Sequence, residues 1–133
     1  MKCGIVFGTW DLLHAGHLHL LSQCKKKCDY LIVGLHVDPS IEREYKNKPI
    51  ESVFERQFRL EATKYVDNVI VYQTEEDLAN ILRVFKPDVR FLGSDYSSLT
   101  PLGMSRQITE PDLVTIEYID SLPIHTTDIR KRI

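Results

Sequence analysis

The sequence predicts an α/β fold of three layers, in which a five-stranded, mainly parallel sheet lies between helices. Short apolar runs alternate along the chain with segments whose apolar residues recur at helical spacing, the pattern of β-α-β units with right-handed crossovers. The run Asp29–Leu35 (DYLIVGL) is apolar almost throughout, as expected for a strand covered on both faces. The chain has 133 residues and no repeat, linker or low-complexity tract, so we expect residues 1–133 to form one domain.

The first half of the chain begins with an expected strand over Lys2–Phe7. A helix is predicted from about Ala15 to Lys27, and the strand Asp29–Leu35 follows it. The residues of this helix that we expect to face inward are Leu18, Leu21 and either Cys24 or Cys28. The polar stretch from Ser40 to Pro49 has no clear period, and we expect a loop there, at the carboxyl end of the second strand.

The second half repeats the alternation. The expected elements are a helix over Ile50–Lys64, a strand over Asn68–Tyr72, a helix from Glu75 to about Phe85, and strands over Val89–Leu92 and Leu113–Ile119. Glu51-Ser52 is a plausible start for the first of these helices, in which Phe54 and Phe58 recur at helical spacing. Thr126-Thr127 is expected to cap a final short helix.

Composition argues against several classes of function. The formal net charge is −2, so the overall charge does not predict binding to nucleic acid. No apolar run is long enough to span a membrane, and the N-terminus leads directly into the first strand, so we expect neither a membrane segment nor a signal peptide. Cys3, Cys24 and Cys28 lack the spacing of a disulfide framework or of a complete metal site. We therefore expect free thiols in a cytoplasmic protein.

The stretch Gly8–His17 (GTWDLLHAGH) joins the first strand to the first helix. His14 and His17 are three residues apart where the helix begins, so both imidazoles should lie on one side of its first turn. Unpaired backbone N–H groups and the positive end of the helix dipole lie beside them. Because imidazole can donate hydrogen bonds to phosphoryl oxygens, the stretch predicts a phosphate site. The alternative is a pair of surface histidines at a helix start.

These ten residues resemble the signature of the cytidylyltransferase branch of the nucleotidyltransferase superfamily, a glycine-threonine-aromatic-aspartate turn followed by His-x-Gly-His. From Gly8 to Thr126-Thr127 the chain resembles glycerol-3-phosphate cytidylyltransferase and its relatives. The resemblance implies a Rossmann-like fold and in-line attack of a substrate phosphate on the α-phosphorus of CTP, with release of pyrophosphate and no covalent enzyme intermediate. It also implies Mg²⁺ held largely through the nucleotide phosphates, and a homodimer.

Four segments are expected to meet at the carboxyl edge of the sheet, where open α/β sheets bind ligands. His14, His17 and Lys46 are the candidate catalytic residues: the imidazoles would stabilise charge on the α-phosphoryl oxygens, and the lysine would bring the acceptor phosphate close. The residues expected to bind the nucleotide are Gly8, Thr9, Trp10, Asp11, Gly16, Lys48, Arg56, Gly93, Asp95, Thr126 and Thr127. Lys46 and His125 are the candidates for contacts with the acceptor.

These roles have structural alternatives. Lys46 and Lys48 could lie in a solvated loop, although the resemblance favours function because the family carries a Lys-x-Lys pair here. Arg56 could form a surface ion pair with a neighbouring glutamate such as Glu55. Asp11 could orient the histidine loop, approach Mg²⁺ or only form the turn. Packing, turn formation or helix capping would explain Trp10, Asp95, Thr126 and Thr127.

The C-terminal segment departs from the family pattern. The glycerol-3-phosphate enzymes carry Arg-Thr-Glu-Gly-Ile-Ser-Thr-Thr before the last helix, and residues 120–127 here read DSLPIHTT. Asp120 stands at the arginine position, Pro123 at the glycine and His125 at the serine. The acceptor is therefore open: glycerol 3-phosphate or the phosphate of another polyol, a sugar or an amino-acid derivative, feeding capsule or cell-wall synthesis, would all fit.

The sequence thus predicts a cytidylyltransferase that transfers CMP from CTP to a small phosphorylated acceptor. An adenylyltransferase of the same superfamily, such as those acting on heptose phosphates, is one alternative, because the motif does not settle the base. A catalytically silent nucleotide-binding module is another, and the charge reversal at Asp120 is the feature that supports it.

Overall fold

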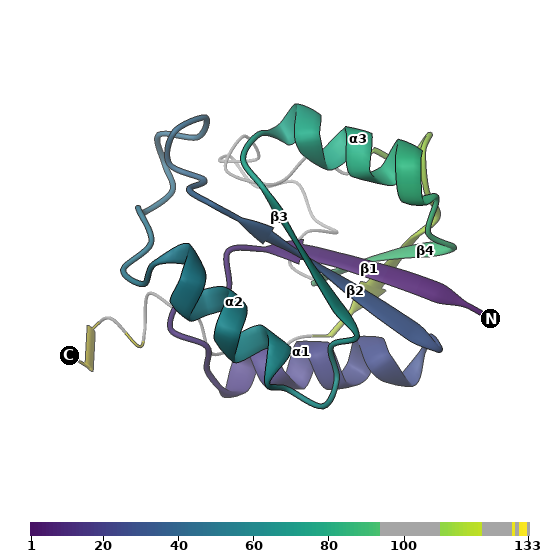
Figure 1. Ribbon diagram of the computed structural model, residues 1–133, viewed down its shortest axis with the longest axis horizontal. Helices are drawn as coiled ribbons and strands as arrows, with labels where there is room; N and C mark the ends of the chain where they lie inside the picture. Colours follow the sequence, from purple (N-terminus) through teal and green to yellow (C-terminus); the bar gives the residue numbers. More distant parts are fainter. Residues whose placement is uncertain (94–109, 121–128, 130, 133) are drawn as a thin grey trace.

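One sheet of five strands forms the middle layer of the computed structural model, which describes residues 1–93, 110–120, 129 and 131–132. The strands are β1 (Cys3–Gly8), β2 (Tyr30–His36), β3 (Asn68–Tyr72), β4 (Val89–Gly93) and β5 (Ile116–Ile119). Their order across the sheet is β3-β2-β1-β4-β5, and every neighbouring pair is parallel (Figure 1). The predicted α/β fold with a mainly parallel sheet is confirmed.

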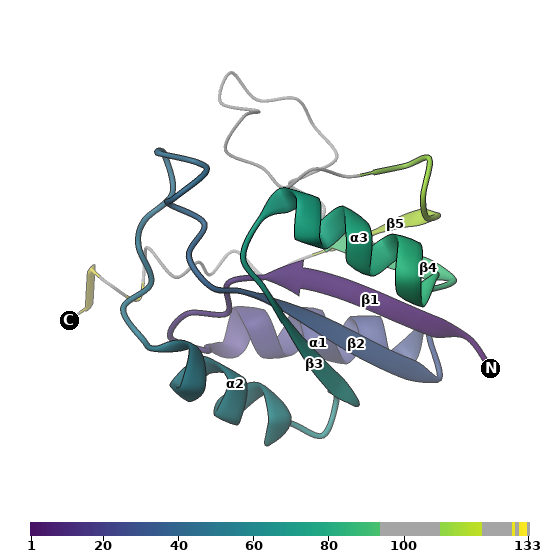
Figure 2. The same cartoon turned by 45° about the horizontal axis from the view of Figure 1, so that its top comes forward.

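Helices cover both faces of this sheet. Helices α1 (Ala15–Lys26) and α2 (Val53–Glu61) lie on one face, and α3 (Glu75–Phe85) lies on the other, as Figures 1 and 2 show. Side chains cap the starts of two of them: the Ser52 hydroxyl accepts the N–H of Glu55, and the Thr74 hydroxyl accepts the N–H of Asp77. These capping boxes begin the helices at defined residues and satisfy N–H groups that the helix leaves unpaired.

The two faces of the sheet carry separate apolar cores. Val6 of β1 belongs to a core with Leu21 of α1 and Leu60 of α2. Ile5, its neighbour in the strand, belongs to the core under Leu78 of α3. Successive strand residues point to opposite faces, so one continuous apolar strand supplies both cores.

Helix α1 buries a narrower stripe than expected. Leu21 and Cys24 are fully buried, as predicted, but Leu18 is exposed, so its expected inward position is wrong. Leu18 lies about a quarter turn away from the middle of the Leu21–Cys24 stripe and falls on the flank of the helix. The predicted free thiols are confirmed, and burial raises the pKa of the Cys24 thiol to about 12, which keeps it protonated.

Helix α2 is turned so that an arginine faces the core and two phenylalanines face solvent. Arg56 is 2% exposed and Leu60 is fully buried, whereas Phe54 is 74% and Phe58 64% exposed. The helical spacing of the phenylalanines predicted the helix correctly. Their rings lie next to each other, with centroids 5.9 Å apart, on the outer surface of the molecule.

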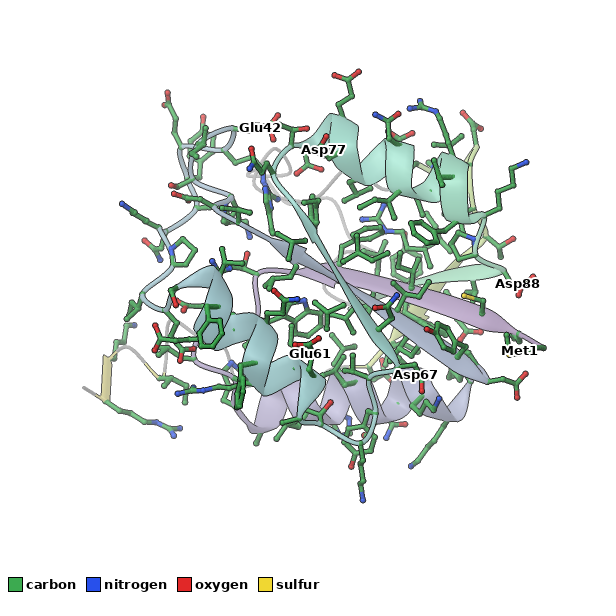
Figure 3. The ribbon with its side chains drawn as sticks, viewed as in Figure 1. Met1, Glu42, Glu61, Asp67, Asp77 and Asp88 are labelled. Carbon is green, nitrogen blue, oxygen red and sulfur yellow. The ribbon has the colours of Figure 1, made fainter. Side chains whose placement is uncertain are left out.

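The strand order reverses direction between β1 and β4, which are neighbours in the sheet but not in the chain. In open parallel sheets, the carboxyl ends of the strands at such a reversal are where ligands bind. The amino ends of the strands lie on the opposite side of the molecule, marked by Met1, Asp67 and Asp88 in Figure 3. There, Asp67 accepts the N–H of Leu31 at 2.8 Å and Asp88 accepts the N–H of Cys3 at 2.7 Å.

Candidate functional site

Two histidines build the N-terminus of α1. His14 is the N-cap residue, and its Nδ1 accepts the N–H of Gly16 at 3.0 Å. The Nδ1 of His17 accepts the N–H of His14 at 3.3 Å in return. The two rings stack with centroids 3.9 Å apart and planes 23° from parallel. The expectation that both imidazoles lie on one side of the first turn is confirmed, and the capping bonds explain why they do.

The capping bonds also select the tautomer of each ring. A ring nitrogen that accepts an N–H carries no proton itself, so the neutral rings of His14 and His17 hold their protons on Nε2. The pair therefore presents N–H donors at a helix N-terminus, the chemistry that suits phosphate oxygens.

Trp10 packs beneath this pair. Its indole Nε1 donates to the carbonyl oxygen of Gly34 at 3.0 Å, and its ring meets the ring of His17 at 5.4 Å, with planes 65° apart. A Cβ atom at Gly8 would lie 2.9 Å from the indole, so Gly8 makes room for Trp10. The structure supports the packing alternative for Trp10, and contacts from Gly8 or Trp10 to a nucleotide stay predictions.

The loop before His14 contains two non-glycine residues in the left-handed region, Trp10 with φ 56° and Leu12 with φ 50°. Each costs about 1–2 kcal/mol and needs support from its surroundings. Asp11, which is buried, accepts the N–H groups of Ile50 and Glu51 at 2.9 Å each. Glu51 accepts the N–H of Leu12 at 2.6 Å. Among the alternatives for Asp11, these contacts support the one in which it orients the histidine loop.

Arg56 lies beneath the same loop. Its Nη1 donates to the carbonyl oxygens of Thr9 at 3.1 Å and His36 at 2.7 Å, and its Nη2 donates to that of Val37 at 2.8 Å. Its Nε donates to the carbonyl oxygen of Glu51 at 3.1 Å. The surface ion pair is therefore wrong as an explanation, because the guanidinium is buried and joins the ends of β1 and β2 to α2. Burial lowers the pKa of Arg56, and nearby carboxylates oppose the shift. A contact with a nucleotide phosphate stays a prediction.

The predicted loop between β2 and α2 is confirmed, and it reaches the same edge of the sheet (Figure 2). Lys46 is half-buried and Lys48 is exposed. Near the start of the loop, Arg43 forms an ion pair with Glu75 of α3, at 3.5 Å. Its far end is held by Asp11 through the N–H groups of the residues that follow Pro49. The structure thus bonds the residues directly after Pro49 to the histidine loop.

The remaining site residues are placed only in part. Gly16 is buried in the first turn of α1, and Gly93 is buried at the end of β4, the strand next to β1 in the sheet. Asp120 follows β5 and is exposed. The expected site residues that lie outside the described residues are Asp95, His125, Thr126 and Thr127. Of the four segments expected to meet, the structure therefore bonds the histidine loop to the residues that follow the Lys46–Lys48 loop and shows only Gly93 of the third segment.

Two residues at this edge were not predicted as site residues from the sequence, Glu51 and His36. His36 is fully buried at the end of β2, where its Nε2 lies 3.0 Å from the carbonyl oxygen of Gln73 and its ring stacks on Tyr72. Burial lowers the pKa of His36; the charge of Arg43 adds to the shift, while the Gln73 carbonyl and nearby carboxylates oppose it. A single histidine at a strand end carries no periodic or spacing signal, so local sequence patterns do not reveal it.

The family described as cytidylyltransferase-like matches residues 5–132. The chain belongs to the cytidylyltransferase-like family. The resemblance that the motif GTWDLLHAGH predicted is confirmed at this level, and membership supports a transferase of the nucleotidyltransferase type. Within the described residues, no helix is long and apolar enough to cross a membrane.

Members similar to this chain include longer proteins. The bifunctional protein HldE of Caulobacter sp. (strain K31) is 39% identical over 104 residues, which are 77% of this chain and 21% of that protein. HldE of Campylobacter fetus is 34% identical over 127 residues, 95% of this chain and 26% of that protein. The chain therefore corresponds to only a part of these curated relatives.

Solved structures agree with the fold. The crystal structure of the lipopolysaccharide core biosynthesis protein from Thermoplasma volcanium has a TM-score of 0.68 and 26% identity, and the match covers 94% of this chain and 99% of that one. Pantothenate synthetase from Thermus thermophilus has a TM-score of 0.62 at 16% identity, with 98% of this chain and 64% of that chain covered. At that identity the second match shows the fold alone. The Rossmann-like fold expected from the resemblance is confirmed.

Proposed function

We propose that the chain transfers CMP from CTP to a small phosphorylated acceptor, releasing pyrophosphate and giving a CDP-activated product. The observation that carries the proposal is the stacked pair of His14 and His17, whose Nδ1 atoms accept backbone N–H groups. Both Nε2–H groups are then donors at the start of α1, the helix that follows β1 at the strand-order reversal. This arrangement supports binding of a triphosphate.

In this mechanism an oxygen of the acceptor phosphate attacks the α-phosphorus of the nucleotide. The new P–O bond forms as the bond from the α-phosphorus to the bridging oxygen breaks, and the electron pair leaves with pyrophosphate. Negative charge builds on the α-phosphoryl and bridging oxygens, where the His14 and His17 N–H groups and the helix dipole stabilise it. The enzyme forms no covalent intermediate.

The Lys46–Lys48 loop brings two anions together. Lys46 contacts the acceptor phosphate and Lys48 the nucleotide, so their charges offset the repulsion between the two substrates. Lys46 is less exposed than Lys48, which supports giving Lys46 the contact nearer to the reacting groups. Asp11 and Arg56 act below the substrates by holding the two loops in place.

A Mg²⁺ ion would be held mainly by the phosphates. Within the described parts of the chain, no group of three or more His, Cys, Asp or Glu side chains is arranged to hold a metal. The groups at the His14–His17 pair are N–H donors, which suit phosphate oxygens. The ion supplies further neutralisation of phosphate charge when it is bound.

Transfer of AMP from ATP is the second candidate. The relatives reported above favour it, since they carry the names HldE and lipopolysaccharide core biosynthesis protein rather than that of a glycerol-3-phosphate enzyme. The second name supports a sugar phosphate as the acceptor. Adenylyltransferases acting on heptose phosphates combine such an acceptor with the same motif.

A panel of substrates tests both candidates. Pyrophosphate release is measured with each of the four ribonucleoside triphosphates against polyol, hexose and heptose phosphates, and products are identified by mass spectrometry. Turnover with CTP supports the first proposal, and turnover with ATP alone replaces it with the second. Nucleotide binding without release for any acceptor would favour a silent module. The His17→Ala variant serves as the background control.

We also propose a homodimer in which α2 faces its copy. Phe54 and Phe58 form an exposed apolar patch on α2. Two antiparallel α2 helices would bring the two phenylalanine pairs together, so the patch is complementary to itself. Light scattering should give a dimer for the wild type and a monomer for Phe58→Glu. A monomeric wild type would contradict the proposal.

A further inference from the structure

Two buried carboxylates join the histidine loop to the start of α2 by crossed hydrogen bonds. Asp11 accepts the N–H groups of Ile50 and Glu51, and Glu51 accepts the N–H of Leu12, across separations of 39 and 40 positions. The two residues are only 4% and 7% exposed. A buried carboxylate is costly unless its oxygens are satisfied, and here backbone N–H groups satisfy them.

The Glu51 end of this connection supports a strained backbone. Leu12 has φ 50°, and its N–H is 2.6 Å from Oε1 of Glu51. His14, the N-cap of α1 and the partner of His17 in the capping box, follows two residues later. The carboxylate therefore sets the direction of the peptide group from which the chain approaches the imidazole pair.

The Asp11 end supports the other loop. The N–H groups of Ile50 and Glu51 belong to the residues directly after the Lys46–Lys48 loop. If that loop moves, it pulls on the hydrogen bonds between Asp11 and the N–H groups of Ile50 and Glu51. Because Leu12 follows Asp11 directly, the displacement also reaches the peptide group of Leu12. The crossed pair thus connects the segment carrying the lysines to the segment carrying the imidazoles.

The two carboxylate oxygens of Glu51 have different partners. Its Oε2 lies 2.8 Å from Nη1 of Arg59, whose side chain is half exposed. The carbonyl oxygen of Glu51 accepts from Nε of Arg56. Arg59 offsets the negative charge at the surface, while the other carboxylate oxygen reaches inward to Leu12. The charge of the side chain at position 51 and its length can therefore be changed independently by mutation.

We propose that Glu51 is a positioning residue for nucleotidyl transfer, which fixes the His14–His17 pair through Leu12 and couples it to the Lys46–Lys48 loop through the crossed bonds with Asp11. The inference rests on the proposed function. It makes the length of the side chain at position 51 decisive and its charge secondary. A merely structural role would lower the free energy of unfolding and leave the rate of the folded protein unchanged.

Two conservative variants separate these cases. Glu51→Gln keeps the length and the acceptor oxygen but loses the charge, whereas Glu51→Asp keeps the charge but withdraws the oxygen by about 1.5 Å. Glu51→Asp should lower kcat by about 10- to 100-fold, the cost of a misplacement of that size, with the nucleotide KM changed by no more than about threefold. Glu51→Gln should stay within about threefold of the wild type in both constants.

Arg59→Ala is the matched control, because it removes the ion pair at Oε2 of Glu51 and leaves the bond from Leu12 to Oε1, so kcat should stay within about twofold of the wild type. Urea unfolding of each variant verifies that the assayed protein is folded. A kcat of Glu51→Asp equal to that of the wild type, or a larger loss in Glu51→Gln than in Glu51→Asp, would overturn the inference.

A measurement without substrates separates this inference from the proposed function. In the ligand-free protein, the amide signal of Leu12 and the ring ¹⁵N signals of His14 and His17 should shift in Glu51→Asp and stay near their wild-type positions in Glu51→Gln and Arg59→Ala. If the wild type turns over no nucleotide with any acceptor, the proposed function fails and these shifts alone decide the positioning role. Unchanged ring signals in Glu51→Asp would overturn it.

Discussion

At both ends of the sheet, aspartate side chains accept backbone N–H groups from neighbouring segments, but the bonds hold different things. At the amino end, the exposed Asp67 and Asp88 accept from Leu31, the second residue of β2, and from Cys3, the first residue of β1, which the sheet already aligns. At the carboxyl end, the buried Asp11 bonds to residues beyond the strands, where no ladder continues. The same kind of bond therefore reinforces a strand at one end of the sheet and fixes the path of a loop at the other.

This difference between the two ends of the sheet indicates where a mutation should change activity without changing stability, and where the reverse should hold. Beyond Gly8 the backbone leaves the sheet and includes two left-handed residues, so side chains alone decide its path. At the amino end, the residues that the aspartates bond lie within strands, so the sheet already fixes the path of their backbone. We expect changes at the carboxyl end to act mainly on the rate, and changes at the amino end to act mainly on the free energy of unfolding.

The strongest test is His17→Ala. We expect kcat to fall by about 10²- to 10³-fold, because charge on the α-phosphoryl group loses a preorganised donor. The free energy of unfolding should fall by only about 1 kcal/mol, the value of one capping bond. His19→Ala, on the same helix, should change neither quantity. Near-normal pyrophosphate release by a folded His17→Ala protein would break the comparison.

Lys46→Ala should have the next largest effect. The acceptor KM should rise by about tenfold or more, since one contact to a charged phosphate is lost. The nucleotide KM should hardly change, and Lys48→Ala should show the reverse pattern. Steady-state kinetics with one substrate saturating measures both constants. An unchanged acceptor KM together with an unchanged kcat would refute the role of Lys46.

At the amino end, Asp67→Ala should cost about 1–2 kcal/mol of unfolding free energy and leave kcat unchanged. The variant removes the acceptor for the N–H of Leu31 and the ion pair with Lys25. Lys25→Ala removes the partly exposed ion pair and a hydrogen bond to the carbonyl oxygen of Asp29 but keeps the bond from Leu31, so it should cost only about 1 kcal/mol or less in urea unfolding. A lowered kcat in folded Asp67→Ala would show that the two ends are not separable.

The dependence of stability on pH should sharpen the comparison, because the two ends titrate in different windows. Burial lowers the pKa of His36 at the carboxyl end, so the unfolded chain binds the proton first and stability falls as the pH drops below about 6.5. Burial raises the pKa of Asp67, but the hydrogen bonds from Lys25 and Leu31 and the charge of Lys25 outweigh it and lower the pKa overall. The stability that this carboxylate contributes should therefore be lost only below about pH 4.

Urea unfolding measured between pH 7 and pH 3 follows both windows. The slope near pH 6 should reach at most about 1.4 kcal/mol per pH unit for one proton. It should flatten in His36→Gln, while Asp67→Ala should flatten only the acidic part. A profile of His36→Gln identical to that of the wild type above pH 5 would contradict the assignment of the upper window.

Much of the fold and part of the candidate site could be predicted because their determinants are local. The apolar runs marked the strands within one or two residues of their ends, except for β5, which starts three residues later than expected. The spacing of His14 and His17 placed both rings on one helical turn, where they cap it. Local patterns did not show which side of α2 faces the core, and so did not reveal the buried position of Arg56.

By itself, the sequence determined the order of strands and helices along the chain, the parallel sheet and the imidazole pair. Hydrophobic periodicity and helix starts depend on only a few neighbouring residues. Only the tertiary structure decided that Arg56 supports Thr9, and that Glu51 and Asp11 connect two loops 39 and 40 positions apart. A parallel sheet gathers the carboxyl ends of its strands at one edge, whatever their separation in the chain. The partners that meet there depend on three-dimensional placement, which short sequence patterns do not encode.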